Sequence, residues 1–268
     1  MATFILYHAN CYDGFGSAYA AWKALGDSAQ YISVHTGERI NQLKVDIPDG
    51  ADVYIQDFTY CRAELLELSL RCSLTVLDHH RTALNDLSGL SFAVLDLNKS
   101  GAMLAWEWWH PNKPIPELMY YLQDRDLQQF HLPLSQEVHY ALGSYPMDFE
   151  VWDSLTVEQL KVEGQVISRF ASQMVETICS HAIKREVCGY SNIPTVNTPI
   201  LMLEVKAKLC QLYPEAPFTA YYFDREDGVR QWGLRANRDD LDVSSVAKQF
   251  GGGGHRLDAG FQEPVNYS

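Results

Sequence analysis

Leu74-Thr75-Val76-Leu77-Asp78-His79-His80 joins an apolar run directly to one acidic and two imidazole side chains. The first four residues favour a short buried strand, because β-branched and large aliphatic side chains are enriched in strands. Adjacent polar residues usually form a solvated loop, but a carboxylate with two imidazoles also suits a divalent metal. The segment therefore predicts a buried strand with a candidate metal site at its carboxyl end.

Further strands and helices are predicted on both sides of this segment. Runs of strand-forming residues occupy 3–7, 29–35, 52–56 and 92–95, and helical patterns occupy 16–25, 62–70 and 102–109. Alternation of strands with helices is typical of a parallel α/β sheet. In such sheets the functional side chains gather at the carboxyl ends of the strands. We therefore expect residues that follow separate strands to share one pocket.

The C-terminal part of the chain predicts a second α/β lobe. Apolar residues recur at helical spacing from about 156 to 184, which indicates a long connecting helix. Strands are predicted at 218–223, 229–234 and 259–262, and a short helix at 244–250 precedes a run of glycines. The expected fold class is α/β, with a parallel-sheet lobe at 1–150, a helical connector at 151–188 and a smaller lobe at 189–268.

The composition narrows the classes of partner. A hydrophobic fraction of 47% over 268 residues is enough to build real cores. The net charge of −13 argues against a long nucleic-acid duplex, which is bound through many Lys and Arg contacts to phosphate. No apolar run approaches the roughly 18 residues of a membrane helix, and a signal-peptide pattern is not seen. We expect a cytoplasmic protein without a membrane partner.

The six cysteines are scattered along the chain and form no Cys-x-x-Cys pair. This spacing excludes a zinc ribbon and a Cys-x-x-Cys redox motif.

Four predicted element ends carry acidic or imidazole side chains. They are His8 to Gly14, Asp57, the Asp78-His79-His80 triplet, and Asp124-Arg125-Asp126 after the apolar segment 118–122, which is helical or extended. Acidic residues after strands often cap the following helix, and for Asp57 alone capping and metal ligation are equally good interpretations. Four such ends together favour a metal cluster, because two ions held by carboxylates and imidazoles can clamp a phosphoryl group and activate water.

With these motifs in order, the sequence resembles DHH-family phosphoesterases that carry a C-terminal DHH-associated (DHHA1) domain. Residues 8–14 resemble the first motif of the family, Asp57 the second, Asp78-His79-His80 the third and Asp124 the fourth. Residues 251–255, Gly-Gly-Gly-Gly-His, resemble the GGGH signature of the associated domain. The resemblance covers most of the chain, and relatives include oligoribonucleases and nucleotide phosphatases.

The resemblance implies a set of metal ligands and catalytic groups. The implied ligands are His8, Asp13, Asp57, His79 and Asp124, with Asp57 bridging two ions. His80 would face the substrate phosphate, and Asp78 would orient an imidazole, as carboxylates commonly do for metal-bound histidines. The implied cofactor is a divalent metal, manganese first, with one or two ions per chain.

The first motif departs from the family pattern. The family usually carries two carboxylates there, separated by one residue, whereas this chain has Asn10-Cys11-Tyr12 before Asp13. Asp13 precedes Gly14 and matches the second carboxylate. Two interpretations of Cys11 remain open: a soft metal ligand, or a buried thiol beside Tyr12, with the buried thiol slightly favoured.

The second lobe offers candidate substrate contacts. Glycines lack side chains, so the backbone of Gly252, Gly253 and Gly254 can approach phosphate oxygens closely, and His255 adds a side-chain donor. Arg235 resembles the arginine that contacts substrate phosphate in the family, and a guanidinium suits paired hydrogen bonds to phosphate. These five residues form the predicted substrate-binding set.

The expected function is therefore a metal-dependent phosphohydrolase. The resemblance implies that a metal-activated water cleaves phosphoester bonds of short oligonucleotides or small phosphorylated nucleotides. One alternative is a phosphoanhydride hydrolase acting on pyrophosphate or polyphosphate. An alternative of another class is a nucleotide-binding protein in which the altered first motif has weakened catalysis. A homodimer also stays open.

Overall fold

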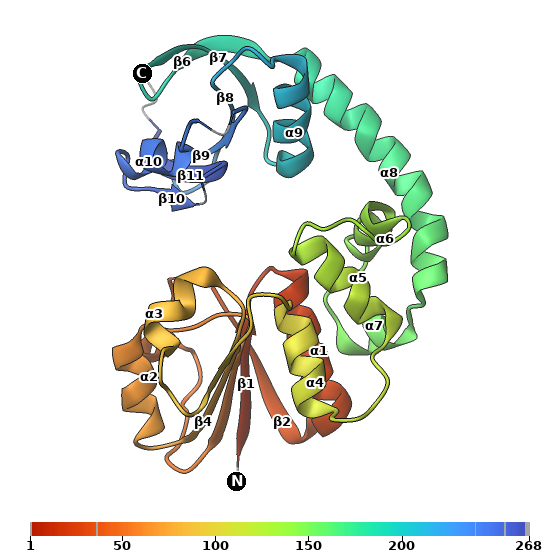
Figure 1. Cartoon of the computed structure of the whole chain (residues 1–268), viewed down its shortest axis with the longest axis vertical. Helices are drawn as coiled ribbons and strands as arrows, with labels where there is room; N and C mark the ends of the chain where they lie inside the picture. The colour runs from red at the N-terminus through yellow and green to blue at the C-terminus, as the bar shows by residue number, and fades with distance from the viewer. Residues whose placement is uncertain (1, 36, 239, 255, 266–268) are drawn as a thin grey trace. The chain divides into compact units, whose positions relative to one another are not determined.

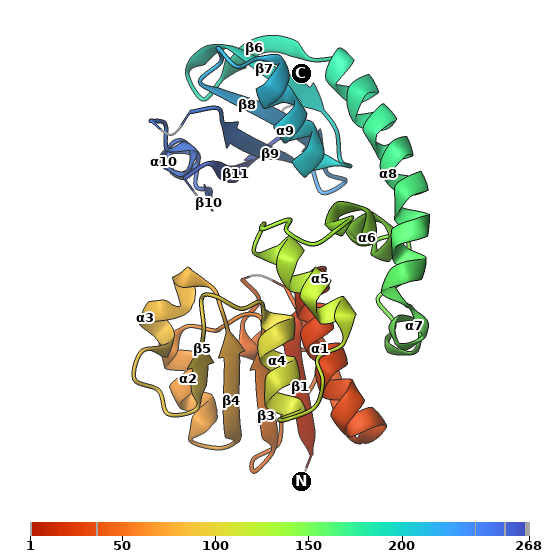
Figure 2. The same cartoon turned by 45° about the vertical axis from the view of Figure 1, so that its right-hand side comes forward.

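The computed structural model describes residues 2–35, 37–238, 240–254 and 256–265. The chain divides into two compact units, Met1–Ile167 and Ser168–Ser268. Each unit contains its own sheet, the first parallel and the second mixed (Figures 1 and 2). The predicted two-lobed α/β fold class is confirmed.

The first unit is built on a five-stranded parallel sheet in the order β2-β1-β3-β4-β5. Its strands are β1 (Thr3–His8), β2 (Ala29–Val34), β3 (Asp52–Gln56), β4 (Ser73–Asp78) and β5 (Ala93–Leu95). In β4, Leu74 and Val76 join the apolar cluster on one face, and Leu77 joins the cluster on the other. The strand is therefore apolar on both sides because helices cover both faces of the sheet.

Helices α1 (Tyr12–Leu25) and α4 (Gly101–Trp109) cover one face, and α2 (Arg62–Ser69) and α3 (Leu84–Leu87) cover the other (Figure 1). Helices α5 (Glu117–Asp126), α6 (Ser135–Leu142) and α7 (Phe149–Ser154) continue the α1 and α4 side, and their apolar residues share one core. Ser100 caps α4, since its side chain accepts a hydrogen bond from the Met103 N–H at 3.3 Å.

Helix α8 (Val157–Ser180) contributes to both units. Val157 and Leu160 lie in the core of the first unit, whereas Val175 and Cys179 lie in a core of the second. The helix ends at Ser180, short of the predicted end near 184, because the chain turns into strand β6 (Ile183–Val187). None of the helices among the described residues is long and apolar enough to cross a membrane.

The second unit contains a six-stranded sheet in the order β10-β11-β9-β8-β7-β6. The remaining strands are β7 (Tyr190–Asn197), β8 (Phe218–Asp224), β9 (Val229–Ala236), β10 (Gly253–Gly254) and β11 (Asp258–Pro264). Helices α9 (Met202–Leu212) and α10 (Val243–Lys248) pack against it. Phe218, Trp232, Leu234 and Phe261 are buried in the core beside α10.

Candidate metal centre

The strand order places His8 and Asp57 at the point where the direction of the sheet reverses. From β1 the chain passes to β2 on one side and then to β3 on the other. The crevice at the carboxyl ends of two such strands is the usual ligand site of an open α/β sheet. His8 ends β1, Asp57 directly follows β3, and His8 Nδ1 lies 3.5 Å from Asp57 Oδ2. The predicted meeting of these residues is observed.

Asp57 is the most constrained residue of the group. It is 1% exposed, and its φ of 63° lies in the left-handed region that side chains other than glycine seldom adopt. A Cβ on Gly101 would lie 2.6 Å from the Asp57 Cβ, so α4 can begin here only with a glycine. Burial raises the pKa of Asp57, but the nearby imidazoles of His79 and His8 outweigh burial and lower the pKa to about 2.

Asp13 is held by the first turn of α4. Its carboxylate accepts hydrogen bonds from the N–H groups of Gly101 at 2.5 Å and Ala102 at 3.0 Å. Its Oδ2 also lies 3.6 Å from His79 Nε2. Burial, followed by the charges of Asp57 and Asp126, raises the pKa of Asp13 well above its usual value. Carboxylates gathered in this way repel one another, and a cation would remove that repulsion.

His79 lies at the centre of the carboxylates. Its Nε2 is 3.1 Å from Asp57 Oδ1. It also lies 3.6 Å from Oδ2 of Asp13 and 3.6 Å from Oδ2 of Asp126. The backbone of the triplet is fixed by Asp78, whose Oδ1 accepts from the N–H of His79 at 2.7 Å and of His80 at 3.1 Å.

Asp78 also fixes the ring of His80. Its Oδ1 lies 2.8 Å from His80 Nδ1, and Asp78 itself is buried. The contact with Asp78 outweighs burial and raises the pKa of His80 to about 9. The His80 side chain is 41% exposed, so it can reach a ligand while Asp78 holds it.

Asp126 lies in the cluster, whereas Asp124 does not. The Asp124 carboxylate is buried and accepts hydrogen bonds from the N–H groups of His131 at 2.8 Å and Leu132 at 3.2 Å. Residues two positions apart on a helix point about 200° apart, so one of the two acids faces the site and the other the following loop. The resemblance implied Asp124 as the ligand, and the sequence, which left the segment helical or extended, did not reveal that Asp126 faces the site. The helical register of the segment is the signal that could have found Asp126.

Three groupings of side chains could each hold a metal ion. They are His8 with Cys11 and Asp57, Asp57 with His79 and His80, and Asp13 with His79 and Asp126; within each, the ligand atoms lie within 4.8 Å of one another. Asp57 and His79 each belong to two groupings, as expected of neighbouring ions that share ligands. Carboxylate, imidazole and thiol groups in this arrangement fit divalent transition metals.

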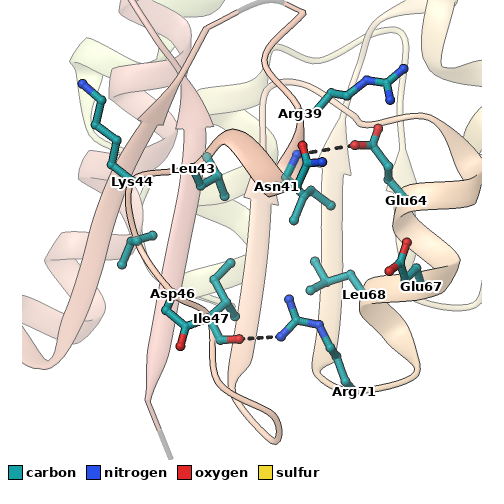
Figure 3. A pocket seen from close by; sticks show the side chains of 12 residues that line it. Arg39, Asn41, Leu43, Lys44, Asp46, Ile47, Glu64, Glu67, Leu68 and Arg71 are labelled. Atoms are coloured by element: carbon teal, nitrogen blue, oxygen red, sulfur yellow. Dashed lines mark hydrogen bonds between the residues drawn. The ribbon is translucent and has the colours of Figure 1, made fainter.

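A pocket of about 410 Å³ adjoins these residues and is lined by His8, Asp57 and His80 together with Arg39 and Glu64. A second pocket, of about 650 Å³, shares Arg39 and Glu64 with it. Figure 3 shows the second pocket, in which apolar side chains lie between charged ones; its labelled residues are Arg39, Asn41, Leu43, Lys44, Asp46, Ile47, Glu64, Glu67, Leu68 and Arg71. Among the described residues Arg39 and Lys44 form no ion pair, so both are available to an anionic ligand.

In the second unit, Arg235 projects from β9 beside a previously unsuspected lysine. Asp258 pairs with both cations: its Oδ2 is 3.3 Å from Arg235 Nη1, and its Oδ1 is 2.5 Å from Lys206 Nζ. Lys206 is 4% exposed, which is rare for a lysine without a structural or binding role. A lysine between the apolar Val205 and Leu209 of an amphipathic helix was the sequence signal for it.

Two glycines of the predicted substrate loop, Gly252 and Gly254, have a structural explanation of their own. A Cβ on Gly252 would lie 2.1 Å from the Gly260 oxygen, and Gly254 has a φ of 139°. Gly253 has open space around it. Arg235 lines a separate pocket of about 390 Å³ with Cys210, Gln211 and Pro214. His255, the fifth member of the predicted set, lies outside the described residues.

Comparison with known proteins gives one related sequence and several related folds. No family model matches the chain. Uncharacterized protein R106 of Acanthamoeba polyphaga mimivirus is 28% identical over 278 residues, covering 96% of this chain and 66% of that protein. The chain therefore spans slightly less than two thirds of the length of this relative.

Solved structures share the fold at low identity. The pGpG-specific phosphodiesterase PggH of Vibrio cholerae has a TM-score of 0.58 and 15% identity, covering 99% of this chain and 94% of that one. An exopolyphosphatase-related protein of Bacteroides fragilis has a TM-score of 0.53 and 11% identity, with 100% and 87% covered. Thermus thermophilus RecJ in complex with Mn²⁺ has a TM-score of 0.53 and 14% identity, with 99% and 49% covered. These likenesses show a shared two-lobed α/β fold.

Proposed function

We propose that this chain is a metal-dependent phosphohydrolase that cleaves phosphoester bonds of short oligonucleotides or small phosphorylated nucleotides. The observation that supports it is the convergence of Asp13, Asp57 and Asp126 around His79 at the carboxyl edge of a parallel sheet. Three carboxylates in one place repel one another and lower the stability of the fold, so a purely structural role does not explain them. Two divalent cations would neutralise them.

The residues divide the work at this centre. Bound divalent cations would supply Lewis-acid charge to phosphoryl oxygens and lower the pKa of a nucleophilic water. Asp57 would hold both ions, because it belongs to the grouping with His8 and Cys11 and lies 3.1 Å from His79 of the grouping with Asp13 and Asp126. Asp126 takes the place that the resemblance implied for Asp124. His80, oriented by Asp78, would contact a phosphoryl oxygen.

Three features of the chain and one fold neighbour favour a short nucleotide substrate. The net charge of −13 disfavours a long polyanion that lacks metal-mediated contacts. Arg39 lies between the pocket at the metal centre and the larger pocket, where it can meet a second phosphate. Lys206 and Arg235 supply two further cations in the second unit. Among the fold neighbours, PggH is described as a pGpG-specific phosphodiesterase.

The exopolyphosphatase-related neighbour supports a second candidate, hydrolysis of phosphoanhydrides such as pyrophosphate or polyphosphate. The leucine and isoleucine side chains in the larger pocket favour the nucleotide over this candidate (Figure 3). They offer an apolar surface that a base can cover and a bare phosphate chain cannot.

The test is a substrate panel with the purified full chain. A short RNA, a linear dinucleotide, a bisphosphorylated nucleotide and pyrophosphate are each assayed with Mn²⁺, Mg²⁺ and Zn²⁺. We expect metal-dependent turnover of the nucleotides, and a loss of at least about a hundredfold in kcat/KM for Asp57→Asn, beyond the loss typical of a group that only supports a ligand. Asp227→Asn, an exposed acid of the second unit, is the control.

The other outcomes separate the alternatives. Turnover of pyrophosphate alone would replace the nucleotide assignment by the phosphoanhydride one. Nucleotide binding without metal-dependent hydrolysis, unchanged in Asp57→Asn, would show a binding protein rather than an enzyme.

A further inference from the structure

Cys11 occupies the position where the sequence lacks an expected carboxylate, and it lies beside two metal-ligand candidates. It is the N-cap residue of α1, in the short loop that follows His8. Its Sγ, a ring nitrogen of His8 and a carboxylate oxygen of Asp57 all lie within 4.8 Å of one another. A thiolate, an imidazole and a carboxylate at this separation form a mixed sulfur, nitrogen and oxygen donor set.

A buried oxygen in the same place independently indicates a cation. Asp57 is 1% exposed, and its Oδ2 has no hydrogen-bond partner among the described residues. The distance of 3.5 Å from Oδ2 to His8 Nδ1 is longer than an ordinary hydrogen bond. A buried carboxylate oxygen without a hydrogen-bond partner lowers the stability of the fold by about 1–3 kcal/mol or more, unless a ligand binds to it.

The count of charges at the centre also gives the thiol a role. Asp13, Asp57 and Asp126 contribute three negative charges, whereas two divalent cations carry four positive ones. A thiol that coordinates a metal is deprotonated outright, so Cys11 would supply the fourth negative charge.

We propose that Cys11 is a ligand of the ion held by His8 and Asp57, and that this ion is softer than manganese, with zinc the best fit. Thiolate favours zinc over magnesium or manganese, whereas the oxygen-rich grouping of Asp13, His79 and Asp126 suits manganese. The two positions would therefore differ in metal preference. The inference rests on the proposed function only in that both use the same centre.

Cobalt(II) reports directly on the donor atoms, because cobalt bound to a thiolate absorbs in the near ultraviolet through charge transfer from sulfur. The full chain, freed of metal, is titrated with Co²⁺ alone. We expect the charge-transfer band in the wild-type protein and its loss in Cys11→Ser and Cys11→Asp. Cys61→Ser, which removes an exposed thiol, should keep the band.

Metal competition supplies a second readout. The wild-type protein should bind one equivalent of zinc at least about tenfold more tightly than Cys11→Ser does. A tenfold loss of affinity is the lower end of the range seen when a metal site is weakened. Cys11→Asp should bind manganese at both positions, because its carboxylate offers the metal an anionic oxygen ligand. It also serves as the second variant if Cys11→Ser does not fold. Binding of Co²⁺ to the wild-type protein without the band, or a band that survives in both Cys11 variants, would overturn the proposal.

These readouts are independent of catalysis. A charge-transfer band in a protein that hydrolyses nothing would leave the Cys11 assignment standing and remove the proposed function. Manganese-dependent hydrolysis in a protein without the band would do the reverse.

Discussion

The carboxylate of Asp57 shows how much of the candidate centre depends on one residue. It follows β3 with a left-handed backbone, contacts His8 and His79, and leaves room for nothing larger than Gly101 at the start of α4. Left-handed residues other than glycine cost of order 1–3 kcal/mol and are concentrated at functional sites. A cap for a helix would not need this strain, and the N-cap of α2 is in fact Cys61. Of the two roles that the sequence offered for Asp57, the structure therefore supports ligation over capping.

Replacing Asp126 and Asp124 separately by alanine distinguishes a ligand from a structural acid. Asp126→Ala should abolish metal-dependent hydrolysis, while the metal-free protein keeps its stability or gains some, because a repelling charge is removed. Asp124→Ala should lower the free energy of unfolding by about 2–4 kcal/mol, since it leaves two N–H donors without their acceptor. Urea unfolding of both variants, with and without Mn²⁺, measures these effects.

Each of the two variants is the control for the other, because Asp124 and Asp126 lie on one helix and have the same side chain. Adding Mn²⁺ should stabilise the wild-type protein and Asp124→Ala, but Asp126→Ala much less, since a ligand stabilises in proportion to its affinity for the folded state. An equal metal response in both variants would remove Asp126 from the centre.

The residues that follow strands were predictable, and the one on a helix was not. His8, Asp57 and His79 each follow an apolar run whose end is visible in the sequence, and the rule that parallel strand ends converge brings them together. The choice between Asp124 and Asp126 depends on the helical phase of α5, which two neighbouring acids do not reveal. Lys206 was missed because a single lysine on an amphipathic helix usually lies in solvent.

At the scale of elements, strands with a strong apolar signal were located closely and the polar ones were missed. The predicted strand 52–56 coincides with β3, whose inner positions are buried. Strand β6, Ile-Lys-Arg-Glu-Val, is an exposed edge strand with few apolar residues, so the helical pattern before it was extended too far. Helices α3, α6 and α7 have four to eight residues and give little periodicity to detect.

Helix α6 makes the stability of the first unit depend on pH through His139. The ring meets Tyr12 edge-on at 5.0 Å, and burial followed by the charge of Arg125 lowers its pKa to about 4. The unfolded chain, with an ordinary pKa near 6.5, binds the proton more readily, so stability should fall as the pH drops from about 6.5 to 4. The difference between a pKa near 6.5 in the unfolded chain and one of about 4 in the folded chain corresponds to a contribution of at most about 3–4 kcal/mol.

His139→Gln isolates this effect. Its free energy of unfolding, measured by urea at pH 7 and pH 5, should decrease less between the two values than that of the wild-type protein. His181→Gln changes an exposed histidine of the second unit and serves as the matched control. An identical pH dependence in wild type and His139→Gln would contradict the assignment.

For the whole molecule, the proposals divide the work between the two units. The first unit contains all the metal-ligand groupings found among the described residues. The second contains Lys206 and Arg235, which share one acidic partner and so keep a net positive charge. Metal affinity and substrate affinity should therefore respond to different substitutions, although one chain carries both.

Arg235→Ala tests this division directly. Hydrogen bonds to charged groups contribute about 1.5–3 kcal/mol, so losing a guanidinium contact to phosphate should raise KM for a nucleotide substrate roughly ten- to a hundredfold. The stabilisation of the protein by Mn²⁺, followed by thermal unfolding, should stay at the wild-type level. Lys206 remains paired with Asp258 in this variant, so no buried charge is left alone.

Arg225→Ala, in the exposed turn before β9, is the matched control and should change neither quantity. Asp57→Asn should show the opposite pattern to Arg235→Ala, with the metal-induced stabilisation reduced. If Arg235→Ala weakened the response to Mn²⁺ while KM stayed unchanged, the second unit would support the metal centre rather than the substrate. The division of labour would then be wrong even if the enzyme is a phosphohydrolase, because metal and substrate affinities would no longer be separable.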